Sequence, residues 1–83
     1  MRLCRGDIID MLVRDGESLV LTAGRCLRIS AEGTETVLYL DRPRSMADLE
    51  AHLGKVFGSP PEGAVDRLVE DLVGADVLQI LAD

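Results

Sequence analysis

The spacing of apolar residues along this chain changes at Ser30. Before that point, short apolar runs are separated by turn-forming residues at Asp15-Gly16 and at Gly24. After it, apolar residues recur at helical spacing, most clearly over Ser45 to Gly58 and Ser59 to Gly74. Alternation with a period of two is typical of strands, and spacings of three and four are typical of helices. The sequence therefore predicts an α+β fold in which a small sheet precedes a group of helices.

Three strands are expected in the N-terminal part, over Asp7 to Arg14, Ser18 to Leu21 and Arg25 to Ile29. Asp15-Gly16 favours a type I′ hairpin turn, because both central residues of that turn need a positive φ. Gly24 marks the second turn. These signals together predict a three-stranded antiparallel sheet with one packed face.

Alternation assigns the faces of two strands. The packed face of the first strand is expected to carry Ile9, Met11 and Val13. In the third strand, Leu27 and Ile29 should point to one side and Cys26 and Arg28 to the other.

The segment after the sheet, Ser30 to Asp41, fits both a helix and a strand. Ser30 can cap a helix, whereas Gly33 costs about 1 kcal/mol in one. The residues that follow include several with strand preference, so the conformation of Thr34 to Leu40 stays open. The apolar tail from Val77 to Leu81 is expected to pack on the core as a short strand or a final turn.

The two later helices have clearer ends. Ser45 and Asp48 form an approximate capping box for the first of them, and Gly58 ends it. In the second, Ser59 is expected to cap, with Pro60 in the first turn and Glu62 reaching back.

The size and charge of the chain limit the number of domains and the classes of partner that it can have. The 83 residues, 47% of them hydrophobic, predict a single domain over residues 1–83. Its net charge of −6 arises entirely after Arg44, where Lys55 and Arg67 face eight acidic residues. An acidic helical half and only two aromatic residues argue against nucleic acid as a partner.

Enzymatic signals are missing from the sequence. His52, the single histidine, is expected at the boundary of a helix, and no Ser or Cys is placed with it by a known motif. We predict no catalytic residues, no cofactor and no metal site, since Cys4 and Cys26 form no ligand spacing. Both cysteines are expected to be reduced and buried, although a disulfide between them stays open. Met1 to Arg5 is too short and polar for a secretory signal, and no apolar run approaches ~18 residues, so we expect a cytoplasmic protein without a membrane span.

A three-stranded antiparallel sheet followed by three helices is the layout of a winged helix-turn-helix domain. Within that layout, three segments carry a family resemblance: Gly24 to Ser30 (GRCLRIS), Leu38 to Leu49 (LYLDRPRSMADL) and Val65 to Leu78 (VDRLVEDLVGADVL). Their order and apolar spacing resemble the PqqD-like family, whose module is also called the RiPP recognition element. The polar start of the first helix at Ala31 to Thr34 departs from the family pattern.

The resemblance implies a non-catalytic peptide chaperone. Such a protein binds the leader segment of a ribosomally made precursor peptide as an added strand and presents it to a radical SAM enzyme, a cyclase or a leader peptidase. Transferred by position, the implied binding residues come from the third strand and the third helix: Arg25, Cys26, Leu27, Arg28, Ile29, Ala64, Arg67, Leu68 and Asp71.

Three alternatives stay open. A winged-helix protein-interaction or transcription-regulatory module would share the layout. A subunit of a larger enzyme would suit the apolar tail at Val77 to Leu81. An unpaired edge strand would also allow a homodimer.

Overall fold

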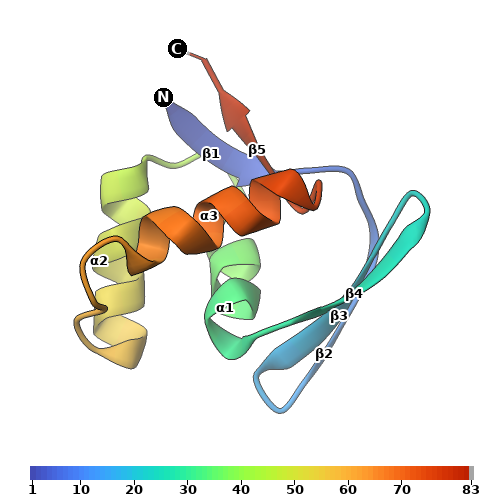
Figure 1. Ribbon diagram of the computed structural model, residues 1–83, viewed down its shortest axis with the longest axis horizontal. Coiled ribbons are helices and arrows are strands. Elements are labelled where there is room, and N and C mark those ends of the chain that lie inside the picture. The colour runs from blue at the N-terminus through green and yellow to red at the C-terminus, as the bar shows by residue number, and fades with distance from the viewer. Residues whose placement is uncertain (83) are drawn as a thin grey trace.

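The computed structural model describes residues 1–82 and shows an α+β fold with five strands and three helices in that range (Figure 1). In chain order the elements are β1 (Arg2–Arg5), β2 (Ile8–Arg14), β3 (Glu17–Thr22), β4 (Arg25–Ile29), α1 (Ala31–Tyr39), α2 (Met46–Phe57), α3 (Ala64–Gly74) and β5 (Leu78–Leu81). Strands β2, β3 and β4 form one antiparallel sheet in that order, and β1 and β5 form a second, two-stranded sheet. No helix in the described range is long and apolar enough to cross a bilayer.

The predicted hairpin turn is confirmed. Asp15 and Gly16 have φ values of 54° and 81°, as a type I′ turn requires, and they join the paired residues Arg14 and Glu17. In the second turn, Thr22 pairs with Arg25 across a two-residue loop.

The predicted face of the first strand is wrong at one residue. A β-bulge shifts the register of β2 between Ile8 and Asp10, so that Ile9 is the extra residue and is 65% exposed. Ile8 takes its place beside Met11 against the interior, and both are half-buried. Alternation alone could not show this, because a bulge resets the period of two.

The open segment after the sheet is a helix, α1. The Ser30 hydroxyl accepts a hydrogen bond from the Gly33 N–H at 3.2 Å, which caps the N-terminus. At the other end, Arg5 donates from Nε to the Val37 carbonyl at 2.8 Å and from Nη2 to the Leu38 carbonyl at 3.4 Å. Two side chains that precede α1 in the sequence therefore satisfy backbone groups at its two ends, where the helix itself leaves such groups without a partner.

Helix α2 has the predicted ends, but α3 does not. Ser45 caps α2 by accepting from the Asp48 N–H at 3.1 Å, and Gly58 ends it with a φ of 86°. Helix α3 is preceded by Gly63 as its N-cap, not by Ser59, and no side chain caps it. The reason is the Pro60-Pro61 pair: a residue before proline is pushed out of the helical region, so Pro60 stays extended and the helix starts after the turn.

The N-terminal strand β1 was not predicted, whereas the tail does form the short strand β5. The two pair in antiparallel register, from Arg2 with Leu81 to Arg5 with Leu78. Leu3 in β1 and Leu78 in β5 are among the largest fully buried side chains. The β1–β5 ribbon is therefore part of the core, and it ties the two ends of the described chain together.

The core lies mainly among the helices and the β1–β5 ribbon. Strand β3 contributes Val20 and strand β4 contributes Ile29. A buried hydrogen bond of 2.7 Å between the Ser18 and Thr34 hydroxyls joins β3 to α1. Figure 1 shows the three-stranded sheet beside α1, with its other face turned away from the helices. We call these two sides the inner face and the outer face.

Candidate functional site

Strand β4 is an edge of the three-stranded sheet, and its free side is the candidate binding edge. The pair that closes a two-residue hairpin is hydrogen-bonded, and such pairs recur at every second residue of an antiparallel ladder. From the Thr22–Arg25 pair, it follows that Arg25, Leu27 and Ile29 direct their backbone groups to β3. Cys26 and Arg28 therefore direct their N–H and C=O groups away from the sheet. We call this free side of β4 the open edge.

The opposite edge of the sheet is protected. On β2 the Arg14–Glu17 pair closes the hairpin and is hydrogen-bonded to β3, as is every second residue before it. The backbone groups of Met11 and Val13 therefore point outward. The Met11 N–H is already taken, since it donates to Asp10 Oδ1 at 2.8 Å. The bulge at Ile9 further distorts this strand. Bulges and local side-chain bonds are common ways to make an edge a poor template for another strand, so the open edge of β4 is the better one.

The predicted strand residues therefore divide into two groups. Cys26 and Arg28 direct their main-chain groups to the open edge. Arg25, Leu27 and Ile29 do not, because their backbone groups are used within the sheet, and Ile29 is a core residue only 7% exposed. These three residues therefore have their main-chain groups directed to β3 and not to an added strand.

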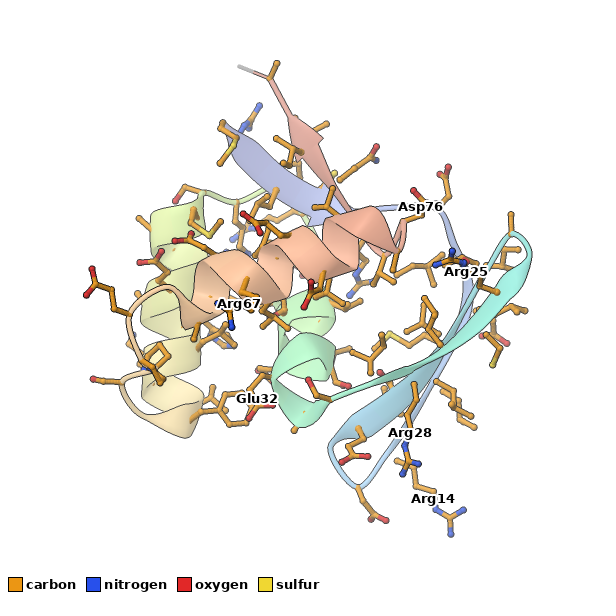
Figure 2. All side chains as sticks on the ribbon, viewed as in Figure 1. Arg14, Arg25, Arg28, Glu32, Arg67 and Asp76 are labelled. Atoms are coloured by element: carbon orange, nitrogen blue, oxygen red, sulfur yellow. The ribbon has the colours of Figure 1, made fainter. Side chains whose placement is uncertain are left out.

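The side chains of β4 also divide between the faces. Leu27 and Ile29 are directed to the inner face with Arg25, which in Figure 2 points toward the end of α3 where Asp76 lies. Figure 2 shows Arg28 projecting on the side away from α3. Its guanidinium is 82% exposed and lies 3.6 Å from the Glu17 carboxylate. Arg28 can therefore meet a bound segment only from the outer face.

Helix α3 presents two of its predicted residues at a cavity and two to solvent. Ala64 and Leu68 are half-buried and line a cavity of about 420 Å³. Arg67 and Asp71 lie one turn apart on the exposed side of the same helix. The row therefore combines two half-buried apolar residues at the cavity with two exposed charged residues.

The end of β4 and the cavity meet at Gly33. A Cβ placed on Gly33 would lie 2.5 Å from Cγ2 of Ile29 and 3.8 Å from Cδ1 of Leu68. Glycine at this position lets the last residue of β4 pack over α1 beside α3. Ile29 at the end of β4 and Leu68 on α3 thus lie on the same part of α1.

Sequence reasoning missed most of the cavity lining. The wall opposite α3 comes from the end of α2 and the loop after it, with Leu53, Phe57, Pro60 and Pro61, and from Ser30 and Glu32 at the start of α1. We call this cavity the α2–α3 pocket. The Pro60-Pro61 pair was the available signal, since two adjacent prolines indicate a rigid extended loop instead of a helix start.

The outer face of the sheet is apolar at its centre and uncovered. Leu12 pairs with Leu19 across β2 and β3, and these residues are 64% and 46% exposed. Cys26 lies on this face and is exposed, so the prediction that it is buried is wrong; Cys4 is half-buried, and both cysteines are free. The outer face is exposed because only the inner face of the sheet packs against the helices.

The single histidine of the chain is held in a cluster of polar and ring contacts. His52 Nε2 lies 2.8 Å from Glu35 Oε1, and its ring stacks on Tyr39 with centroids 3.9 Å apart. The Arg44 guanidinium covers the other side of that pair, 4.1 Å from the Tyr39 centroid. Residues 1–82 hold no group of three metal-ligating side chains. What the described geometry offers is a template for an extended chain.

Comparison of the chain with protein-family models, with curated proteins and with solved structures finds no match.

Proposed function

We propose that this protein is a non-catalytic peptide chaperone that binds the leader segment of a precursor peptide on the open edge of β4. The observation that carries the proposal is the difference between the two sheet edges. Cys26 and Arg28 offer outward backbone groups, whereas the Met11 N–H on the other edge is bonded to Asp10. An extended peptide satisfies such groups by forming a further strand.

The surroundings of the open edge support the same function. The half-buried Leu68 on α3 and Ile29 at the end of β4 both lie beside Gly33 of α1, so a docked strand would have apolar side chains on its inner side. Main-chain pairing would supply affinity and side-chain pockets would supply specificity. The PqqD-like spacing of apolar residues agrees with this proposal. So does the order of a sheet followed by helices, which we interpret as a winged helix with the β1–β5 ribbon added.

The proposal includes a partner enzyme and a location. A chaperone of this kind presents its peptide to a modifying enzyme or a leader peptidase in the cytoplasm. The uncovered Leu12 and Leu19 on the outer face are a surface on which such an enzyme could dock beside the peptide.

A transcription-regulatory winged helix is the alternative, and α3 disfavours it. In that fold the third helix enters the major groove. Here its exposed residues include Asp66, Glu70 and Asp71, with Arg67 as the single cation of the helix. Phosphates would be repelled by this surface.

The test is to remove a single hydrogen-bonding group, the N–H of Arg28, from the open edge. Arg28→Pro removes an outward N–H and leaves the β3 ladder intact, because Arg28 does not bond to β3. Arg28→Ala keeps the N–H and removes only the side chain. Val13→Pro makes the same change on the opposite edge. Each variant would be titrated by calorimetry with synthetic leader peptides of the short precursor frames encoded beside the gene, after thermal melts confirm folding.

We expect Arg28→Pro to weaken binding by about tenfold or more, because it removes a backbone hydrogen bond and places a ring at the edge. Arg28→Ala and Val13→Pro should bind within about threefold of the wild type, since a threefold change is well under 1 kcal/mol. Equal binding by Arg28→Pro and the wild type would exclude β-augmentation at β4. Retention of duplex DNA at physiological salt would favour the alternative.

A further inference from the structure

We propose that a groove between α3 and the β1–β5 ribbon is a second interaction surface, which binds a basic amphipathic helix of a partner protein. This inference goes beyond the proposed function, because it concerns a different side of α3 from the one beside β4. The groove has a volume of about 510 Å³, and we call it the ribbon groove. Its lining includes four apolar side chains and two acidic ones: Met46, Val69, Val73, Ile80, Asp66 and Glu70.

The ribbon groove and the α2–α3 pocket lie on opposite sides of α3. Ala64 and Leu68 line the pocket, whereas Asp66 and Glu70 line the groove. Successive residues of a helix are rotated by about 100°, so Glu70 lies about 200° from Leu68 around the axis. Figure 1 shows the ribbon above α3, whereas α1, which follows β4, lies below it. A helix in the groove and a strand on the open edge can therefore be bound at the same time.

The apolar part of the groove is only partly covered by the protein itself. Ile80 on β5 is 51% exposed, and Met46 and Val73 are half-buried. Val69, which is buried, lies beneath them in the lining. Packing an apolar face against these side chains removes water from them. Met46 has a flexible, polarisable side chain that adapts to the shape of a partner.

The length of the groove fits two turns of a docked helix. The lining residues of α3 run from Asp66 to Gly74, a distance of about 12 Å at 1.5 Å per residue. An amphipathic helix contacts a groove through residues at i, i+3 or i+4, and i+7, which extend over about 10.5 Å. The wall formed by α3 therefore has the length that such a set of contacts needs.

The charge of the groove selects the kind of helix. Asp66 and Glu70 are the charged side chains of the lining, and both are exposed one turn apart on α3. Lysine or arginine residues that flank the apolar face of a docked helix would pair with them. After Arg44 the chain has eight acidic residues against Lys55 and Arg67, so this half of the protein attracts a cationic segment and repels an anionic one.

The probe for the test is a synthetic eighteen-residue peptide of leucine and lysine, with leucines three and four residues apart so that one face is apolar. A shuffled peptide of the same composition lacks that face, and a leucine–glutamate peptide keeps the face and reverses the charge. Binding is followed by NMR titration of the full chain. We expect the leucine–lysine peptide to shift the methyl signals of Met46, Val73 and Ile80, and both other peptides to bind about tenfold more weakly or less.

Two charge reversals separate the groove from general attraction to an acidic protein. Glu70→Lys reverses a charge in the lining. Asp7→Lys makes the same change in net charge at an exposed bend that lines none of the cavities described here. We expect Glu70→Lys to weaken binding about fivefold, and Asp7→Lys to stay within about twofold of the wild type. Equal losses would show that the peptide follows net charge alone and would overturn the inference.

Two apolar variants make the same comparison. Ile80→Ser removes an exposed side chain from the groove, and Ile9→Ser removes one that is 65% exposed on β2. Ile80→Ser should weaken binding about fivefold, because about half of that side chain is left to be buried by the partner. Ile9→Ser should bind as the wild type does. Since Glu70 is exposed, its charge reversal still tests the groove if Ile80→Ser disturbs the ribbon.

Three other results would overturn the inference. The first is a shift of the Leu12 and Leu19 methyl signals in place of those of the groove, which would place the peptide on the outer face. The second is a shift of the groove signals when the protein alone is concentrated, which would make the occupant a second copy of the chain. The third is a leucine–lysine peptide that does not bind. The Arg28→Pro titration tests the open edge of β4 separately from all three.

Discussion

Gly33 offers the sharpest single test of how β4, α1 and α3 are packed together. A Cβ added there would lie 2.5 Å from Cγ2 of Ile29 and 3.4 Å from Oγ of Ser30. Real Cβ contacts essentially never fall under 3.0 Å, so Ile29 must shift in Gly33→Ala. Ile29 is 7% exposed and lies at the end of β4, where neighbouring side chains leave it little room.

Two opposing effects set the magnitude. Inserting a methyl group into a packed site costs about 1–3 kcal/mol. Replacing glycine by alanine in a helix returns at most about 1 kcal/mol. We expect a net loss of about 1–2 kcal/mol in the free energy of unfolding, which lowers Tm by about 4–8 °C for each kcal/mol in a domain of this size.

Gly54 supplies the matched control. It lies inside α2, and a Cβ there would meet nothing within 4 Å, so Gly54→Ala should gain up to about 1 kcal/mol. Urea denaturation followed by far-UV circular dichroism measures both variants against the wild type. If Gly33→Ala proves as stable as the wild type, the close packing of Ile29 over α1 is incorrect.

Two further predictions concern polar contacts that hold α1 in place. Ser18→Ala should cost about 1–3 kcal/mol, because it leaves the buried Thr34 hydroxyl without its 2.7 Å partner. The double variant with Thr34→Val should lose less than the sum of the single variants in urea denaturation, and strict additivity would contradict the contact. Arg5→Ala should cost about 1–2 kcal/mol by removing the donors to the Val37 and Leu38 carbonyls, and it should speed amide exchange at the end of α1. Unchanged exchange there would show that Arg5 does not hold the helix end.

Features that depend on neighbours in the sequence were predictable. The Asp15-Gly16 turn follows from the φ values that the hairpin needs, and Ser45 and Gly58 mark the ends of α2. Each rests on backbone groups within a few residues, where the competing conformations are few. The prediction that Ser59 caps α3 was wrong, because Pro61 keeps Pro60 out of the helical conformation.

Features that depend on distant parts of the chain were not predictable. Strand β1 has only four residues, which is too few to show a strand pattern by itself. It is identified as a strand by its pairing with β5 at the other end of the chain. The helical state of α1 depends on Arg5, which lies 32 residues before the carbonyl of Val37. Local preference was balanced there, and the tertiary contacts decided it.

The candidate site falls between these cases. The sequence indicated β4 and α3 as neighbours of a binding edge, but the roles of individual residues required the ladder. Alternation predicts where side chains point, whereas the pairing register decides which backbone groups face outward. The register directs the backbone groups of Arg28 and Cys26 outward and those of Ile29 toward β3. The α2–α3 pocket could not be inferred, since its walls come from three separate segments.

The single usable edge also limits self-association. A homodimer formed by pairing two copies of β4 would occupy the backbone groups of Cys26 and Arg28, which are the groups that a peptide needs. Such a dimer and a peptide complex therefore exclude each other at the edge. Each chain also carries a net charge of −6, so two copies of the chain repel each other. A peptide with few acidic residues avoids that repulsion, and the charge of the helices thus favours the peptide over a second copy of the chain.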